Sequence, residues 1–356
     1  ASPTYTQATW TTDVIPPGTT GISFGLNLIQ NGTLVTDDYA LYNTVGAPDA
    51  GAPSVVSTSR LSGVDRYATA VEVSKSGFAP GVARVYVATG YNFPDALSAA
   101  PAAARAKSPV LLTDQGTLPD VVRDEIRRLK PAQIVVVGGA PSVSEAVFAQ
   151  LKALAPAVRI AGDDRYATSR AIAKDAFGTT GARTAYIATG TNFPDALAAG
   201  PAAARYDGPI LLVPGNATTL DAATRALIEE LGITQVRIAG GTPSLSAGIE
   251  AGIRDTRGVT AVSRFAGADR LATAAAINRD AFPTGDTIYL AMSTNFPDAL
   301  VGSALAGLQG RPLFLTQTQC TDQGVLDGIK RMGATKVVLL GGTPSLSEAV
   351  ARLAPC

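Results

Sequence analysis

Short apolar runs alternate with helix-like stretches along most of the chain, most clearly in the second of three similar segments. There the expected strands are Val158–Ala161, Ala185–Ala188, Pro209–Val213 and Gln235–Ala239. The expected helices are Arg165–Phe177, Pro194–Arg205, Leu220–Leu231 and Ser244–Ile253. Runs such as Ile210-Leu211-Leu212 are apolar at every position, as expected for parallel strands covered on both faces. Four β-α units therefore predict a small, open, parallel α/β sheet in each segment.

Three motifs recur in one order and at nearly equal spacing. The hexapeptide Asn-Phe-Pro-Asp-Ala-Leu occupies residues 92–97 and returns 100 and then 103 residues later. A Gly-x-Asp-Arg motif precedes it and a Gly-Gly-x-Pro-Ser-x-Ser motif follows it in every copy. A period of this length is domain-sized, which predicts three copies of one domain rather than a solenoid of thin repeats. The expected copies are residues 54–156, 157–258 and 259–356.

The leader, residues 1–53, has a different pattern. Asn31-Gly32 separates two strand-like runs, Ile22–Gln30 and Thr33–Tyr42, which predicts a β-hairpin. A stretch rich in Gly, Ala and Pro follows at residues 46–53 and predicts a linker. The leader is too short for a large core, so either it docks on the copies or it is the remnant of a larger β domain.

Composition and charge exclude several classes of protein. Hydrophobic residues make up 46% of the chain and charged residues 16%, as in a globular protein. No apolar run approaches the roughly 18 residues of a membrane span, so we expect none. The net charge is zero, divided into −4 for residues 1–59 and +4 for residues 60–356. Without a basic run, nucleic acid is not an expected partner, whereas the mild positive bias suits an anionic ligand.

The two cysteines, Cys320 and Cys356, both lie in the third copy. A disulfide between them would tie down the terminus and indicate an oxidising, extracellular setting. Against the pairing, the end of a final helix should lie at the sheet edge opposite Cys320. In its favour, the last helix is short and stops about one turn early. The first residues, Ala1-Ser2-Pro3, also look like an end left by cleavage at a small-residue site.

The Asn-Phe-Pro-Asp loop has a structural and a functional interpretation. Structurally, Asn92 would be the N-cap, Pro94 would sit in the first helical turn, and Asp95 would close a capping box. Functionally, the loop lies at the carboxyl edge of the sheet, where open α/β sheets bind ligands and free helix amides attract anions. The candidate ligand-binding residues in the three copies are Asn92, Asn192, Asn295, Asp95, Asp195 and Asp298.

The helix after this loop carries small side chains on several faces, with Ala at most positions from Ala96 to Ala104. Such residues let helices approach closely, so we expect the three corresponding helices to meet where the copies contact one another. The alternative is an ordinary Ala-rich helix with no special contact.

The Asp-Arg pairs, Asp65-Arg66, Asp164-Arg165 and Asp269-Arg270, follow a glycine at a strand end. In the structural interpretation Asp is an N-cap and Arg binds a carboxylate across the interface between copies. In the functional one, Arg66, Arg165 and Arg270 bind phosphate or carboxylate groups of a ligand.

The Gly-Gly-x-Pro-Ser-x-Ser loop lacks both nucleotide-binding fingerprints, the six-position glycine pattern and the Gly-Lys-Ser/Thr ending. Ser142 with Glu145, and Ser345 with Glu348, fit a capping box, whereas Ser244 faces Ala247 and does not. The last serine of each loop is a further candidate for ligand binding: Ser144, Ser246 and Ser347.

Catalysis has little support in the sequence. The chain contains no histidine, which excludes Ser-His-Asp and Cys-His catalysis and removes the commonest metal ligand. We therefore expect no catalytic residues, metal or cofactor. Paired carboxylates could still serve a glycosidase, but the recurring acids are matched by symmetry, and three equal sites favour multivalent binding.

Together the motifs resemble the cell wall-binding repeat 2 family, through Arg60–Ala70, Asn92–Leu97, Pro109–Leu112 and Gly138–Ser144 and their two later copies. The resemblance spans residues 60–356. It implies three Rossmann/Toprim-like subdomains around a pseudo-threefold axis, in a monomeric, secreted surface protein of a Gram-positive, actinobacterial cell. It also implies non-covalent anchoring to an anionic wall polysaccharide, such as a teichoic acid-like polymer, in grooves between subdomains.

The third copy departs from the family pattern at Leu271, which replaces Tyr67 and Tyr166, and at Ser293, which replaces Gly90 and Gly190. One groove is therefore expected to bind differently or to serve structure alone. Two other functions remain open: a wall-glycan hydrolase that uses carboxylates, and a secreted adhesin that acts through the leader.

Overall fold

The computed structural model describes residues 56–356, and the predicted leader hairpin and linker lie outside the described residues. Each of the three copies contains four helices. The first copy comprises β1 (Ser57–Leu61), α1 (Arg66–Gly77), β2 (Arg84–Thr89), α2 (Pro94–Arg105), β3 (Val110–Thr113), α3 (Asp120–Leu129), β4 (Gln133–Val137) and α4 (Glu145–Lys152). The second comprises β5 (Ala157–Ile160), α5 (Arg165–Phe177), β6 (Thr184–Thr189), α6 (Pro194–Arg205), β7 (Ile210–Val213), α7 (Ala222–Glu230), β8 (Gln235–Ala239) and α8 (Ala247–Arg254). The third comprises β9 (Ala261–Phe265), α9 (Arg270–Ala281), β10 (Thr287–Met292), α10 (Pro297–Leu308), β11 (Leu313–Thr316), α11 (Gln323–Met332), β12 (Lys336–Leu340) and α12 (Glu348–Ala351).

These elements form three four-stranded parallel sheets, which confirms the expected fold class. The strand orders are β3-β2-β4-β5, β7-β6-β8-β9 and β1-β12-β10-β11. In the first two sheets the fourth strand is the one that begins the next copy in the chain: Ile134 of β4 pairs with Ala157 of β5, and Gln235 of β8 pairs with Ala261 of β9. The last sheet is completed by β1, where Leu61 pairs with Leu340. The three copies are thus joined into a ring by main-chain hydrogen bonds.

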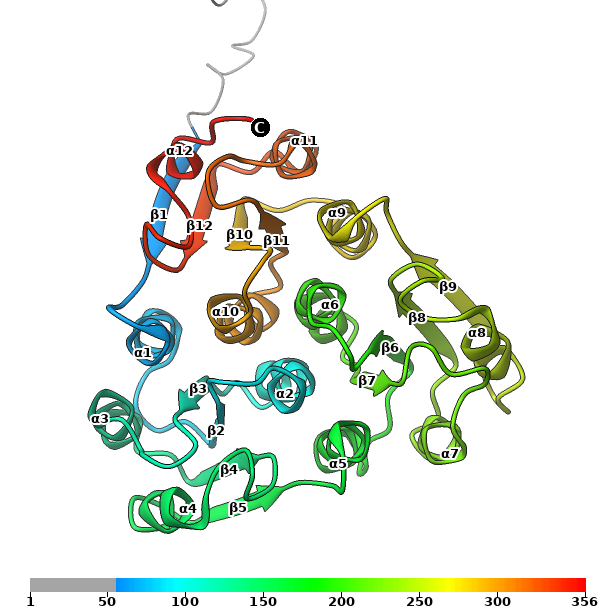
Figure 1. Ribbon diagram of the computed structural model, residues 1–356, viewed down its shortest axis with the longest axis horizontal. Coiled ribbons are helices and arrows are strands. Elements are labelled where there is room, and N and C mark those ends of the chain that lie inside the picture. Colours follow the sequence, from blue (N-terminus) through cyan, green and yellow to red (C-terminus); the bar gives the residue numbers. More distant parts are fainter. Residues whose placement is uncertain (1–55) are drawn as a thin grey trace, which may run out of the picture. The chain divides into compact units, whose positions relative to one another are not determined.

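Helices α2, α6 and α10 contact one another at the centre of the ring, around a pseudo-threefold axis, with the three sheets outside them (Figure 1). Small residues make this approach possible. A Cβ on Gly200 would lie 2.0 Å from Ser303 Oγ, and a Cβ on Gly307 would lie 2.8 Å from the Cβ of Ala204. The expectation that the three small-sided helices meet is confirmed.

The expected helix starts were less accurate in the loops after β4, β8 and β12. Helix α8 begins at Ala247 rather than Ser244, because Ser246 is its N-cap and accepts a hydrogen bond from the amide of Ile249. The preceding residues form a turn in which the amides of Ser244 and Leu245 donate to Gly241.

The final helix explains how the two cysteines meet. Helix α12 has only four residues, and Leu353 adopts a positive φ of 57° that turns the chain back. Pro355 then lies beside Thr321, whose amide donates to the carbonyl of Ala354. Cys320 and Cys356 form the disulfide, with their Cα atoms 4.9 Å apart. The short last helix therefore removes the geometric objection to this pairing.

A membrane-spanning helix is absent from residues 56–356, since none of the helices there combines sufficient length with sufficient apolar character.

Candidate functional site

The candidate arginines open the helices that face the neighbouring copies. Asp65 caps α1 by accepting a hydrogen bond of 2.7 Å from the amide of Ala68, as predicted, and Asp164 and Asp269 do the same for α5 and α9. The cap fixes the next residue, so its side chain reaches the β-α loop of its own copy. Arg165 donates to the carbonyl of Gly190 at 2.6 Å, and Arg270 donates to that of Ser293 at 2.9 Å. Arg66 donates in the same way to Gly90.

This geometry corrects one of the two interpretations of the arginines. In the structural interpretation each would bind a carboxylate of the neighbouring copy, but within residues 56–356 each donates to a main-chain carbonyl and none of the three forms an ion pair. Each guanidinium makes a single protein hydrogen bond there, so most of its five N–H donors are open to solvent or a ligand. Arg66 and Arg165 are half-buried and Arg270 is exposed.

The phenylalanines of the three hexapeptides meet at the axis. Phe93 and Phe193 have ring centroids 5.5 Å apart, and Phe296 lies 5.8 and 5.9 Å from them, all in edge-on or tilted orientations. Such geometry is favourable for aromatic pairs. Two of the arginines lie beside this cluster: the guanidinium carbons of Arg165 and Arg270 lie 6.0 Å from the ring centroids of Phe93 and Phe193, respectively. We call the surface where the three hexapeptide loops and the three arginines lie the face.

The aspartates of the hexapeptide are largely buried and do not make the capping boxes of the structural interpretation. Asp95 does not close a capping box; it accepts a hydrogen bond of 2.7 Å from Ser142 Oγ, and Asp298 accepts one of 3.0 Å from Ser345. Asp195 occupies the same place, and a Cβ on Gly240 would lie 2.5 Å from its Oδ2. The aspartate thus ties the start of the central helix to the loop after β4, β8 or β12.

Burial raises the pKa of all three carboxyls above the ordinary value, and the serine hydroxyls and one arginine each oppose that shift. The arginine always belongs to the adjoining copy: Arg165 acts on Asp95, Arg270 on Asp195 and Arg66 on Asp298. Each seam, defined as the contact of a central helix with the arginine-bearing helix of the adjoining copy, therefore contains one Asp and one Arg.

The asparagines are exposed on the same face but are not helix caps. The N-caps of α2, α6 and α10 are the phenylalanines, and none of the three helices has a side-chain cap. Each asparagine Oδ1 instead accepts a hydrogen bond from the next amide, at 3.1 Å for Asn92 and 2.9 Å for both Asn192 and Asn295. Each asparagine therefore stabilises its own loop rather than the first turn of the helix.

The serine candidates belong to a different part of the molecule. Ser144 and Ser246 cap α4 and α8 at the outer side of each sheet, while Ser347 precedes α12 without a side-chain cap hydrogen bond. The capping boxes expected for Ser142 and Ser345 are wrong, because both hydroxyls bind aspartates. The structure thus brings together the Arg, Asp and Asn candidates and leaves these three serines apart.

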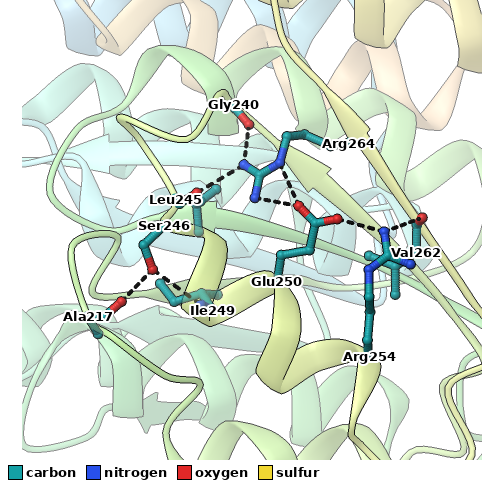
Figure 2. A network of polar contacts seen from close by, with 9 residues as sticks. All are labelled: Ala217, Gly240, Leu245, Ser246, Ile249, Glu250, Arg254, Val262 and Arg264. Atoms are coloured by element: carbon teal, nitrogen blue, oxygen red, sulfur yellow. Dashed lines mark hydrogen bonds and ion pairs between the residues drawn. The ribbon is translucent and has the colours of Figure 1, made fainter.

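Sequence reasoning missed the arginine at the carboxyl end of β1, β5 and β9. Figure 2 shows one example, in which Arg264 donates to the carbonyls of Gly240 and Leu245 and forms an ion pair of 2.8 Å with Glu250, itself bound by Arg254. Arg159 and Arg60 repeat the arrangement with Glu145 and Glu348, at 3.1 and 3.6 Å. The signal was available, since Arg60 opens the family motif. These side chains hold the strand that each copy lends to its neighbour.

The two departures in the third copy are coupled. A Cβ on Gly90 would lie 2.9 Å from Tyr67 Cε1, and one on Gly190 would lie 2.6 Å from Tyr166 Cε1. The tyrosine ring therefore packs on a glycine that has no room for a side chain. In the third copy Ser293, which has a Cβ, stands in place of the glycine, and Leu271, which has no ring, stands in place of the tyrosine.

A cavity of about 160 Å³ lies in the third copy between α9 and α11, lined by Ala275, Arg279, Phe314, Gly324, Asp327, Gly328 and Arg331. It contains none of the candidate residues. Within residues 56–356 no cluster of His, Cys, Asp or Glu side chains suits a metal ion.

Comparison with known proteins agrees with the motifs. A family model described as Cell wall binding domain 2 (CWB2) matches residues 60–148, 159–250 and 264–351. The N-acetylmuramoyl-L-alanine amidase LytC of Bacillus subtilis is 31% identical over 296 residues, which cover 83% of this chain and 57% of LytC. The Amidase enhancer of Bacillus subtilis is 30% identical over 297 residues, which cover 83% of this chain and 40% of that protein.

Two solved structures share the fold. Cwp6 from Clostridium difficile has a TM-score of 0.77 at 25% identity, over 88% of this chain and 50% of that chain. Cwp8 from Clostridium difficile has a TM-score of 0.75 at 28% identity, over 84% of this chain and 51% of that chain. The chain thus spans about half the length of the relatives it matches, and the shared part is the three-copy body.

Proposed function

Since the chain belongs to the Cell wall binding domain 2 family, we propose that its three-copy body anchors a secreted surface protein to the cell wall by binding an anionic secondary polymer, without catalysing a reaction. The polymer is teichoic acid-like in charge, and it binds across the seams at Arg66, Arg165 and Arg270. Cell wall binding itself follows from the family, whereas the choice of polymer and of these residues rests on the geometry of the face.

The observation that carries the proposal is the ring of three incompletely bonded guanidinium groups. A planar guanidinium binds phosphate or carboxylate oxygens in pairs, and each of these three already has its orientation fixed by one carbonyl hydrogen bond. For Arg66 and Arg165, which are half-buried, partial burial strengthens such an interaction relative to one in open water. The site is therefore prepared for anions before a ligand arrives.

The central helices add to this preference. Helices α2, α6 and α10 all begin at the same face without a side-chain cap, and the partial positive charge of a helix N-terminus favours anions. A positive helix end and a fixed guanidinium at each of three seams match a polymer that repeats its negative charge. Binding at several seams at once would raise the overall affinity well above that of one seam.

A binding experiment on purified Gram-positive cell walls tests the proposal. We expect the protein to sediment with intact walls and to remain in solution after the anionic polymers have been stripped. Arg66→Ala, Arg165→Ala and Arg270→Ala combined should weaken binding by at least tenfold and flatten its dependence on salt. Arg257→Ala is the matched control, because Arg257 is exposed and pairs with Glu229 away from the face. Equal binding to stripped walls would contradict the proposal.

A wall-glycan hydrolase is the second candidate, because a buried carboxyl with a raised pKa, as in Asp95, is a property of general acids. Release of reducing ends or peptides from peptidoglycan that disappears in Asp95→Asn would favour it. Sedimentation with intact walls and no release would favour anchoring. Deleting residues 1–53 separates a third candidate, an adhesin acting through the leader, since anchoring should survive the deletion.

A further inference from the structure

The three seams share one arginine and one buried aspartate each but differ at two exposed positions. Tyr91 lies in the loop between β2 and α2 and is 65% exposed, unusually open for a large hydrophobic side chain. The residues at the same place in the other two copies are Thr191 and Thr294. Val64, at the start of the same seam, is 99% exposed, where the other copies have Asp163 and Ala268. The Arg66 seam therefore has an apolar, aromatic surface that the other seams lack.

The ring of Tyr91 stands beside the cation of the seam. The guanidinium carbon of Arg66 lies 5.8 Å from the ring centroid of Tyr91, within range of a cation–π contact. Tyr67, which packs on Gly90, lies close to both. Burial raises the pKa of Tyr67 to about 12, and the nearby Tyr91 and Asp114 add to the shift. Arg66, Tyr67 and Tyr91 thus form one cluster, with Tyr91 as its open member.

This combination suits a charged carbohydrate better than a bare polyanion. The C–H face of a sugar ring packs on an aromatic face, while its hydroxyl groups can bond with a phenol such as that of Tyr91. Tyr and Arg together are also the residues that most often dominate binding surfaces. A phosphate or carboxylate next to such a sugar would fall within reach of Arg66.

Resting on the proposed function, we propose that the seam of Arg66, Tyr67 and Tyr91 recognises a sugar unit of the wall polymer, whereas the seams of Arg165 and Arg270 bind only its charge. Tyr91 is then the residue that distinguishes a glycan from other polyanions. The pseudo-threefold body would carry one specific subsite and two general ones.

Two probes separate sugar recognition from charge binding: polysaccharide released from purified Gram-positive walls, and inorganic polyphosphate, which carries no sugar. Tyr91→Ala should weaken binding of the polysaccharide by about tenfold, a reasonable cost for one aromatic contact, and leave polyphosphate binding within twofold. Tyr91→Phe should retain most of the affinity. Thr191→Ala, the matched control, should change neither. Melting curves of all variants should coincide, because both side chains are exposed.

A transplant gives an independent readout. The second copy already has Arg165, Tyr166 and Gly190 in the places of Arg66, Tyr67 and Gly90, so Thr191→Tyr rebuilds the cluster with one substitution. It should strengthen polysaccharide binding severalfold, whereas Thr294→Tyr should not, because the third copy has Leu271 and Ser293.

Three outcomes would overturn the inference. Equal effects of Tyr91→Ala and Thr191→Ala, or equal losses for both probes, would reject it while leaving the proposed function intact. If the unmodified protein binds neither the polysaccharide nor the polyphosphate, the inference and the proposed function are both rejected.

Discussion

The first and third copies fold alike, yet they reach the same backbone with different side chains at two places. Beside the seam, Tyr67 lies over Gly90 in the first copy, and Leu271 accompanies Ser293 in the third. The tyrosine ring occurs with a glycine, which has no Cβ, and the serine, which has a Cβ, occurs with a leucine, which has no ring. The two side chains of the pair therefore fill one shared space in both copies, although neither residue is the same.

The second difference lies between the helices that cover each sheet. In the first copy Glu125 has no exposed side-chain surface and is bound by Ser74 and Arg128. In the third copy Gly328 replaces the glutamate, and the ring of Phe314 takes up the space, with its Cζ 2.6 Å from where a Cβ would be. A buried glutamate with two polar partners and an aromatic ring thus fill the same place in two copies, and the cavity of the third copy lies beside this ring.

The largest expected effect concerns a feature of the third copy alone. Replacing Cys320 and Cys356 with serine opens a loop with a sequence separation of 36, which should lower the free energy of unfolding by about 4 kcal/mol on the chain-entropy argument. Urea denaturation measures the loss, and a reducing agent should shift the unmodified protein by the same amount. Unchanged midpoints in both experiments would show that the tail needs no tether.

The buried pair of the first copy should give the next largest effect. Glu125→Ala leaves the buried Ser74 hydroxyl without its partner and should cost about 2 kcal/mol of unfolding free energy in urea denaturation. Ser74→Ala with Glu125→Leu, which reproduces Ala173 and Leu227 of the second copy, should recover most of it. Glu72→Ala is the control, because its pair with Lys75 is solvent-exposed. A loss equal to that of the control would mean the pair is dispensable.

The coupled positions beside the seam predict a smaller loss of stability, which a second substitution should partly reverse. Gly190→Ser should cost about 1 to 2 kcal/mol, because its Cβ would meet the ring of Tyr166. Tyr166→Leu combined with Gly190→Ser recreates the third copy and should be more stable than the serine variant alone. Thermal unfolding of the two single variants and the double variant provides the coupling energy. Simple additivity of the two changes would refute the coupling.

The smallest effect concerns what all copies share. Burial raises the native pKa of Asp95, Asp195 and Asp298 above 3.8, so their protonation favours the folded state. This contribution is fully present below the ordinary pKa and is lost as pH rises through the raised values. The triple Asp→Asn variant should therefore gain stability relative to the unmodified protein as pH rises from about 4 to 7. Parallel stability curves over that range would contradict the shifts.

The local sequence pattern predicted much of the fold, but it did not predict how the strands are ordered or how the side chains pair at the candidate site. Apolar runs predicted the strands, the Asp65 type of N-cap predicted the starts of the arginine-bearing helices, and the small side chains from Ala96 to Ala104 predicted the contact among the three central helices. The order of strands did not follow, because nothing within β5 indicates which sheet receives it. The pairing of Ser142 with Asp95 was missed because Ser142 and Ser144 are equally plausible caps in sequence, and only the folded loop chooses between them.

The lending of strands between copies has an evolutionary consequence. In an open solenoid a unit can be gained or lost at either end, because every unit meets only its neighbours. Here β1 pairs with β12 and closes a ring of three units. In a protein with two or four units, the rotation from one unit to the next would not bring the first strand beside the last sheet. The bare β12 would then be a new edge, open to pairing with another chain. Unequal recombination between these similar gene segments should thus be removed by misfolding, which would keep the number of units at three.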